Sequence, residues 1–270
     1  MHTVTRVSVL LILSLVAALP GYSNDRRFTY TYETSVLLPG AREIETWNTY
    51  RSGREYFYRG FDQRVEYEFG VSRNLMGSVY LNATNSFQDS AGVTKSGDPI
   101  SSSSLGFSTE WKYKLMDRVA DPLGLALYGE FTAGPSATEL EGKLLMDKEI
   151  GRSLLAFNAV LERGWDNEIE NGSASTSADY ELEFDAGFSY AISNQFSAGL
   201  EAQNVSEIEG GEIETSPLFL GLVAAYESEG WWTALTFMPQ VTTFAGATSG
   251  HLDLEAHEKY EARILLSFHI

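Results

Sequence analysis

Cysteine is absent from the 270-residue sequence, which excludes a lipoprotein, because lipid attachment would need a cysteine after the N-terminal apolar run. Basic residues are scarce, since 19 Lys and Arg stand against 37 Asp and Glu, for a formal charge of -18. So acidic a chain repels phosphates and offers no basic stripe, which excludes nucleic acid as a partner. Beyond the N-terminus, no stretch approaches about 18 uninterrupted apolar residues, so no transmembrane helix is expected.

The first residues have the features of a secretory signal peptide. Arg6 precedes an apolar run from Val7 to Leu19, and Gly21 and Ser23 are small residues at suitable cleavage positions. The apolar run is shorter than the roughly 20 residues that a membrane anchor needs. We therefore predict a signal peptide over residues 1–23 and export of the mature chain.

Apolar and polar residues alternate along most of the remaining chain. Between residues 177 and 203, acidic residues occupy alternate positions and apolar residues lie between them. Alternate side chains of a strand point to opposite faces, so one face of this strand is acidic and the other apolar. Twelve segments show this two-residue period, and no comparable stretch has a helical period. The segments lie near 43–51, 59–71, 75–86, 105–115, 123–132, 139–148, 154–163, 178–190, 195–204, 217–226, 231–241 and 258–270.

Three features favour a membrane barrel over a soluble β-sandwich. The segments are about 10–11 residues long, enough to cross roughly 25 Å of hydrocarbon when tilted, whereas soluble strands average about 5–6 residues. Short connections such as 72–74 and 192–194 alternate with long ones, as periplasmic turns and extracellular loops do. Aromatic residues cluster at strand ends, where an interfacial girdle belongs: Tyr113, Tyr190, Tyr226, Trp231, Trp232, Tyr260 and Phe268.

The sequence thus predicts an all-β fold, a closed antiparallel transmembrane β-barrel of about 12 strands over residues 43–270, with short periplasmic turns and longer extracellular loops. A bilayer forbids an open sheet edge, so the sheet must close with its apolar face in lipid and its polar face around a wet lumen. The residues expected to line the lumen are Arg64, Glu66, Glu68, Glu110, Lys112, Lys114, Glu130, Asp179, Glu181, Glu183, Asp185, Glu201, Glu261 and Arg263.

Two stretches near the start of the predicted barrel, "LPGAREIETWNTYRSG" and "FDQRVEYEFGVSRNLMGSVYLN", carry a family resemblance. They resemble the opening of a family of uncharacterised proteobacterial outer-membrane β-barrels of the porin or transporter type, over roughly residues 28–85. The last segment is similar to the C-terminal signal strand of such barrels, although the family habit is a final Phe and this chain ends in Ile270. The resemblance implies an outer-membrane location, with membrane lipid and the outer-membrane assembly machinery as partners. It implies no activity.

The histidines offer little chemistry. His251 and His257 lie near Asp253, Glu255 and Glu258, a set that could bind a divalent cation, although the spacing matches no known ligand pattern and a solvated loop is the alternative. The Ser–His constellation of a hydrolase cannot be found. We therefore expect no enzyme, no catalytic residue, no metal and no cofactor.

Residues 24–42 precede the first clear strand and carry Arg26, Arg27 and Arg42. They form either a periplasmic tail or a plug inside the acidic lumen. The acidic lumen itself has two interpretations, a solvated and partly cross-paired wall or a cation-favouring pore. We expect passive passage of a small polar or cationic solute. The alternative is a non-conducting barrel with a structural, adhesive or lipid-hydrolysing role.

Overall fold

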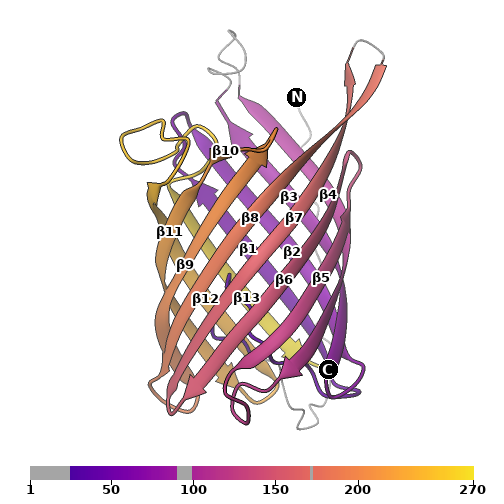
Figure 1. Ribbon diagram of the computed structural model, residues 1–270, viewed down its shortest axis with the longest axis vertical. Coiled ribbons are helices and arrows are strands. Elements are labelled where there is room, and N and C mark those ends of the chain that lie inside the picture. Colours follow the sequence, from indigo (N-terminus) through magenta and orange to yellow (C-terminus); the bar gives the residue numbers. More distant parts are fainter. Residues whose placement is uncertain (1–24, 90–98, 171–172) are drawn as a thin grey trace, which may run out of the picture.

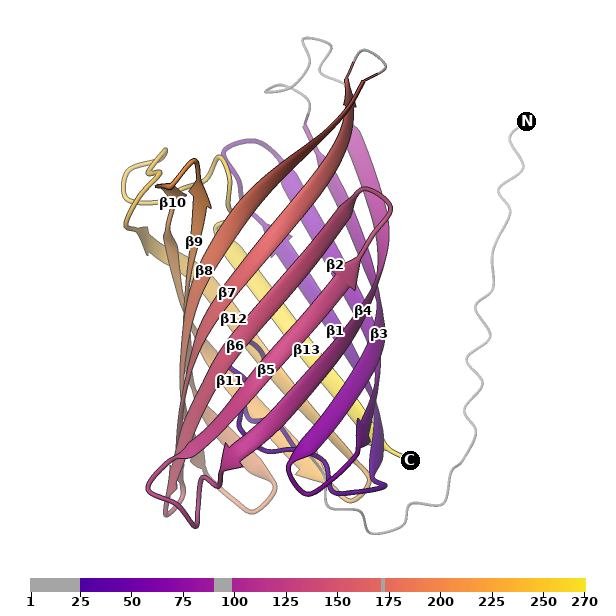
Figure 2. The same cartoon turned by 45° about the vertical axis from the view of Figure 1, so that its right-hand side comes forward.

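The computed structural model describes residues 25–89, 99–170 and 173–270, and within these ranges the protein is built from antiparallel strands (Figures 1 and 2). The predicted signal peptide lies outside the described residues. The strands are β1 (Arg42–Ser52), β2 (Tyr58–Gly70), β3 (Leu75–Gln88), β4 (Ile100–Met116), β5 (Gly124–Ala133), β6 (Ala137–Ile150), β7 (Ser153–Glu170), β8 (Ser173–Ala191), β9 (Phe196–Glu209), β10 (Glu212–Thr215), β11 (Pro217–Ser228), β12 (Trp231–Thr243) and β13 (Tyr260–His269). No helix in the described ranges is long and apolar enough to cross a membrane.

The sheet closes on itself through its first and last strands. β1 pairs with β2 along one edge and with β13 along the other, where the register runs from Glu43 opposite His269 to Ser52 opposite Tyr260. The short strand β10 pairs with β9 as a hairpin at the rim, and β9 continues the wall to β11. The prediction of a closed antiparallel barrel with twelve wall strands is confirmed.

The two-residue alternation of the sequence sets the two faces of the wall. Apolar side chains on the outer face are exposed, as lipid-facing groups of a barrel are; examples are Val65, Leu127, Phe184, Phe237 and Ile264. Their chain neighbours Glu66, Asp185 and Leu265 are buried on the inner face. A bilayer supplies the apolar surroundings that water would not.

The first wall strand begins, and the last wall strand ends, at the end of the barrel that has the short turns (Figures 1 and 2). We call this the periplasmic end. β1 begins there and β13 ends there, beside turns at 71–74, 151–152, 192–195 and 229–230. The other, extracellular, end carries the long connection 244–259. Several strands extend further toward this end than predicted, because ladder pairing continues into polar segments; Ser101–Ser104, expected in a loop, pair with β3.

The periplasmic half of the barrel has a packed interior. Residues 25–37, drawn in indigo, run inside the wall at this end, and the exposed residues 38–40 lead out to β1 (Figure 1). Tyr32 from this segment packs with Trp47, Tyr128 and Trp232 of the wall in one apolar cluster. The expectation that Trp232 belongs to an interfacial girdle is wrong: it is 1% exposed and points inward, since Trp231 beside it takes the outer face.

Candidate functional site

Glu201 on β9 binds the backbone of the N-terminal segment. Its Oε1 accepts the backbone N–H groups of Thr29 (3.1 Å), Tyr30 (2.9 Å) and Thr31 (2.8 Å), and its Oε2 accepts the hydroxyl of Thr236. The Glu201 side chain is fully buried. Successive N–H groups that converge on one oxygen form an anion-binding concavity, so the segment is shaped around this carboxylate.

Two more wall side chains satisfy the segment's backbone. The amide of Asn158 accepts the Tyr32 N–H (2.7 Å) and donates to the Tyr32 carbonyl (2.9 Å). Asp147 accepts both the N–H (2.9 Å) and the hydroxyl (2.6 Å) of Thr34. Buried backbone groups need such partners, and the segment obtains them from β6 and β7 side chains instead of from a strand ladder.

The charged and phenolic side chains of the segment also have ionic, aromatic or hydrogen-bonding partners inside the barrel. The guanidinium of Arg26 lies 4.2 Å from the ring centroid of Tyr32 and 3.7 Å from Oε1 of Glu45. The Tyr30 hydroxyl donates to Glu261 at 2.8 Å. Burial, reinforced by the Glu261 carboxylate, raises the pKa of Tyr30 well above its usual value, so Tyr30 remains a neutral donor.

Most of the carboxylates expected to line the lumen of this half are buried instead. The predicted residues that are no more than 5% exposed are Glu66, Glu68, Glu110, Lys112, Asp185 and Glu201. Lys114 lies at the periplasmic end, where its Nζ is 3.3 Å from Asp117. The buried side chains face the interior, as predicted, but the N-terminal segment and neighbouring side chains cover them.

Above the N-terminal segment the lumen opens into a cavity of about 470 Å³, which we call the vestibule. Tyr30, Tyr32 and Trp47 are among its lining residues and separate it from the packed half. Five residues predicted to line the lumen lie on its surface: Arg64, Glu130, Glu181, Glu183 and Arg263. Asp179 is exposed further along β8 toward the extracellular end.

One side of the vestibule carries carboxylates without basic partners. Glu139 (β6), Glu162 (β7), Glu181 and Glu183 (β8), which we call the acid wall, line the cavity, and none of them forms an ion pair with a described residue. Glu162 stands directly opposite Glu181 in the ladder and opposite Glu141 on its other side. Like charges in such cross-strand pairs destabilise a sheet, so this arrangement is costly unless cations or protons neutralise some of the carboxylates.

Two arginines lie on strands β2 and β13, across the barrel from β7 and β8 (Figure 1). Arg263 stacks on Tyr30 at 3.8 Å from the ring centroid, and its Nε donates to the Thr49 hydroxyl at 2.9 Å. Arg64 stacks on Tyr80 at 4.0 Å and donates from Nε to Asn82 at 2.9 Å. The vestibule therefore has an acidic side and a basic side.

Sequence reasoning did not identify Tyr30, Tyr32, Asn158 or Asp147 as functional residues. A usable signal was present, because residues 28–32 alternate aromatic side chains with threonine as a short extended segment would. Glu139 was also missed, although it lies two residues before Glu141 and therefore on the same face of the strand.

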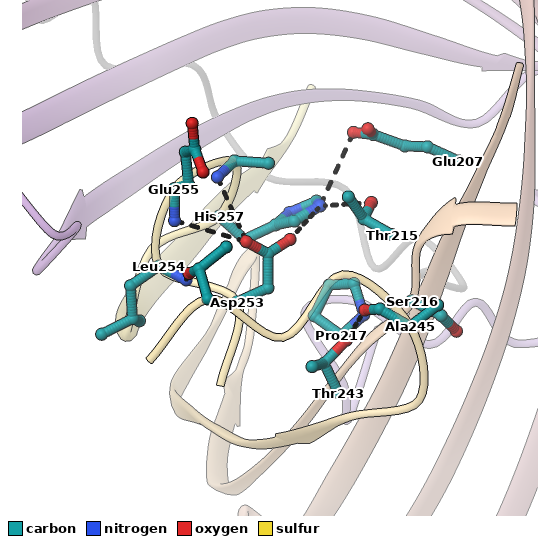
Figure 3. A network of polar contacts seen from close by, with 12 residues as sticks. Glu207, Thr215, Ser216, Pro217, Thr243, Ala245, Asp253, Leu254, Glu255 and His257 are labelled. Carbon is teal, nitrogen blue, oxygen red and sulfur yellow. Dashed lines mark hydrogen bonds and ion pairs between the residues drawn. The ribbon is translucent and has the colours of Figure 1, made fainter. Parts of the chain in front are cut away.

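The histidine-bearing connection 244–259 lies at the extracellular end (Figure 1), and Figure 3 shows its His257 beside Thr215, Glu207 and Asp253. Nε2 of His257 lies 3.1 Å from the Thr215 hydroxyl, 3.6 Å from Glu207 and 4.0 Å from Asp253. Thr215 and Asp253 thus approach the same ring nitrogen, unlike a catalytic triad, in which the acid orients the ring through the other nitrogen.

The candidate cation ligands of this connection do not converge. Glu258 turns away from His257 to the guanidinium groups of Arg51 and Arg54, at 3.1 Å from each. Although burial opposes it, this pairing lowers the pKa of Glu258. His251 is exposed, and the described part of the chain holds no group of three or more His, Asp or Glu residues that could bind a metal ion.

Comparison with known proteins supports the fold. The model of a family of unknown function (DUF6662) matches residues 21–270. No curated protein matches the chain. Among solved structures, the COG4313 outer membrane channel from Pseudomonas putida F1 has a TM-score of 0.60 at 10% identity, covering 88% of this chain and 98% of that chain.

Two further barrels are similar. The NanC porin has a TM-score of 0.54 at 12% identity and covers 83% of this chain and 98% of its own. The translocator domain of the autotransporter NalP from Neisseria meningitidis has a TM-score of 0.55 at 13% identity and covers 85% of this chain and 88% of its own. At these identities the likeness shows a shared outer-membrane barrel fold.

Proposed function

We propose that this chain, which belongs to the family of unknown function (DUF6662) and is an outer-membrane β-barrel, is a passive channel for small polar solutes with a preference for cations. The observation that carries the proposal is the vestibule, a polar cavity of about 470 Å³ whose acid wall has no basic partner among the described residues. Unpaired carboxylates around a confined path raise the local concentration of cations.

Residues 25–41 act in this proposal as the plug of the channel. They fill the periplasmic half of the lumen, and their backbone is held by Glu201, Asn158 and Asp147. Passage then requires the segment to shift or leave. Polar anchoring favours such movement over a purely apolar contact, because water can replace hydrogen-bond partners once the segment is displaced.

Single-channel recording of the refolded protein in planar bilayers tests both parts. Deletion of residues 25–37 should raise the conductance or the open fraction, because it removes the plug and leaves the wall strands complete. Unchanged conductance in the deletion variant would show that the segment does not limit passage.

Reversal potentials under a salt gradient test the selectivity. Exchanging the four glutamates of the acid wall for glutamine should weaken the cation preference, and low salt should strengthen the wild-type preference as the Debye length grows to about 30 Å at 0.01 M. The matched control exchanges four exposed rim glutamates for glutamine: Glu209, Glu212, Glu214 and Glu255. An anion preference, or equal selectivity in the two variants, contradicts the proposal.

A non-conducting barrel with a structural or adhesive role is the alternative, and the packed periplasmic half favours it. The variant that lacks residues 25–37 distinguishes the channel from the non-conducting barrel. If it inserts into the bilayer with native heat-dependent gel mobility and still carries no current, the barrel is not a channel. We propose no enzymatic activity for either case.

A further inference from the structure

The vestibule holds opposite unpaired charges on its two sides. Three of its carboxylates form ion pairs: Asp62 with Arg51, Glu130 with Arg64 and Glu141 with Lys143. No described base lies within ion-pair distance of the four glutamates of the acid wall, and Lys143, which acts on three of them, forms its ion pair with Glu141. Arg263, on the other side, has no carboxylate within ion-pair distance in the described part of the chain, although the chain is strongly acidic.

The geometry of Arg263 favours a carboxylate ligand. Nε is used by the Thr49 hydroxyl and Nη1 lies 3.4 Å from the Thr29 carbonyl, while the guanidinium plane stacks on Tyr30. These contacts fix the orientation of the group and leave Nη2 without a hydrogen bond to a described residue. A guanidinium held in this way presents preorganised N–H donors to a carboxylate at low entropic cost.

The acid wall favours ammonium groups. Glu141, Glu162 and Glu181 are direct cross-strand neighbours on β6, β7 and β8. The Cα atoms of each adjacent pair therefore lie about 4.5–5.5 Å apart. Lys143 forms an ion pair with Glu141, with Nζ 3.1 Å from Oε2, and no described base lies within ion-pair distance of Glu162 or Glu181. An ammonium group between Glu162 and Glu181 would relieve their repulsion and donate hydrogen bonds to both.

We propose that the vestibule binds small molecules that carry a carboxylate and a distal ammonium group, as a basic amino acid does, with the carboxylate on Arg263 and the distal ammonium group on the acid wall. A ligand with a net positive charge is favoured, because four glutamates without an ion pair face one guanidinium without an ion pair. The cavity volume of about 470 Å³ falls within the usual range of small-molecule sites. The solute's route through the barrel rests on the proposed channel function, whereas its binding does not.

Isothermal titration calorimetry of the refolded full barrel in uncharged detergent at low salt tests the site. The probes are lysine, cadaverine, which is lysine without its carboxylate, and hexanoate, which has only the carboxylate. Lysine should bind saturably and about tenfold more tightly than cadaverine, because a charged hydrogen-bonded pair with Arg263 adds to its affinity. Hexanoate should not bind, since the acid wall repels it.

Arg263→Gln should lower the affinity for lysine by about tenfold and leave cadaverine binding equal or tighter. The control variant Arg152→Gln, at an exposed position of the periplasmic turn between β6 and β7, should change neither affinity. The comparison of the three probes needs only the wild-type protein, so the test stands even if Arg263→Gln fails to fold.

Equal affinities for lysine and cadaverine overturn the inference, as does lysine binding that survives Arg263→Gln unchanged. Absence of saturable lysine binding overturns it too. Cation-selective conductance in the same preparation would then leave the proposed channel standing. Saturable lysine binding in a protein that never conducts would support the site and overturn the channel.

Discussion

Replacing Glu201 by alanine should release the N-terminal segment from the barrel interior. The Glu201 carboxylate accepts three successive backbone N–H groups, those of Thr29, Tyr30 and Thr31. If water cannot replace it, each orphaned donor costs about 1–3 kcal/mol, or about 3–9 kcal/mol for the three. If water fills the space, the net loss is about 0.5–1.5 kcal/mol per bond, or about 1.5–4.5 kcal/mol in total. Even the smallest figure shifts the equilibrium toward the released state about tenfold.

The absence of cysteine makes the release measurable. A Thr31→Cys reporter places a thiol where the native side chain is 0% exposed and its hydroxyl has no hydrogen-bond partner, so the reporter itself removes no bond. A maleimide can reach this thiol when the segment leaves the interior. With rapid opening and closing, Glu201→Ala should therefore raise the labelling rate at least about tenfold.

Asp185→Ala is the matched control for this experiment. Asp185 lies on the neighbouring strand β8 and is as deeply buried as Glu201, but it accepts no hydrogen bond from a described residue of the segment. Labelling of the reporter should be unchanged in this background. If the two alanine variants label at the same rate, the hydrogen bonds to Glu201 do not hold the segment, and the reasoning fails.

Two other predictions concern the wall and the rim. Phe184→Arg puts a charge on the exposed apolar face at a cost of about 2–4 kcal/mol, so its folding yield on heat-dependent gels should fall below that of Glu181→Gln; the reverse ranking would invert the assigned faces. Because Arg51 and Arg54 lower the pKa of Glu258, this contact should stabilise the rim fully above about pH 4.5 and lose its effect as the pH falls through the lowered pKa. Thermal unfolding between pH 7 and 3 should show this loss, and a wild-type profile identical to that of Glu258→Gln would contradict it.

The wall of the barrel could be predicted because each strand encodes it locally. The period of two that places Phe184 outward and Asp185 inward is visible in the sequence without knowledge of any partner strand. The extracellular extensions could not be predicted in this way. Ser101–Ser104 pair with β3 outside the apolar band, where the ladder continues but the alternation of hydrophobicity does not.

The division of the lumen into a packed and an open half could not be read from the sequence. The alternation assigns Glu201 and Glu181 alike to the polar face, yet one is buried under the N-terminal segment and the other lines the vestibule. That difference depends on where residues 25–41 lie, and their contacts join positions far apart in the chain, such as Thr29 and Glu201, which are 172 residues apart. A local pattern carries no information on such pairs.

The long-range contacts of residues 25–41 also bear on the order in which the protein assembles. Most wall strands pair with a sequence neighbour, so hairpins can form as soon as both strands are available. The Tyr30 hydroxyl, in contrast, meets Glu261 across 231 residues, on the strand that also seals the seam with β1. The interior of the periplasmic half is therefore completed only when β13 has paired, so residues 25–41 reach their final contacts at the end of barrel assembly.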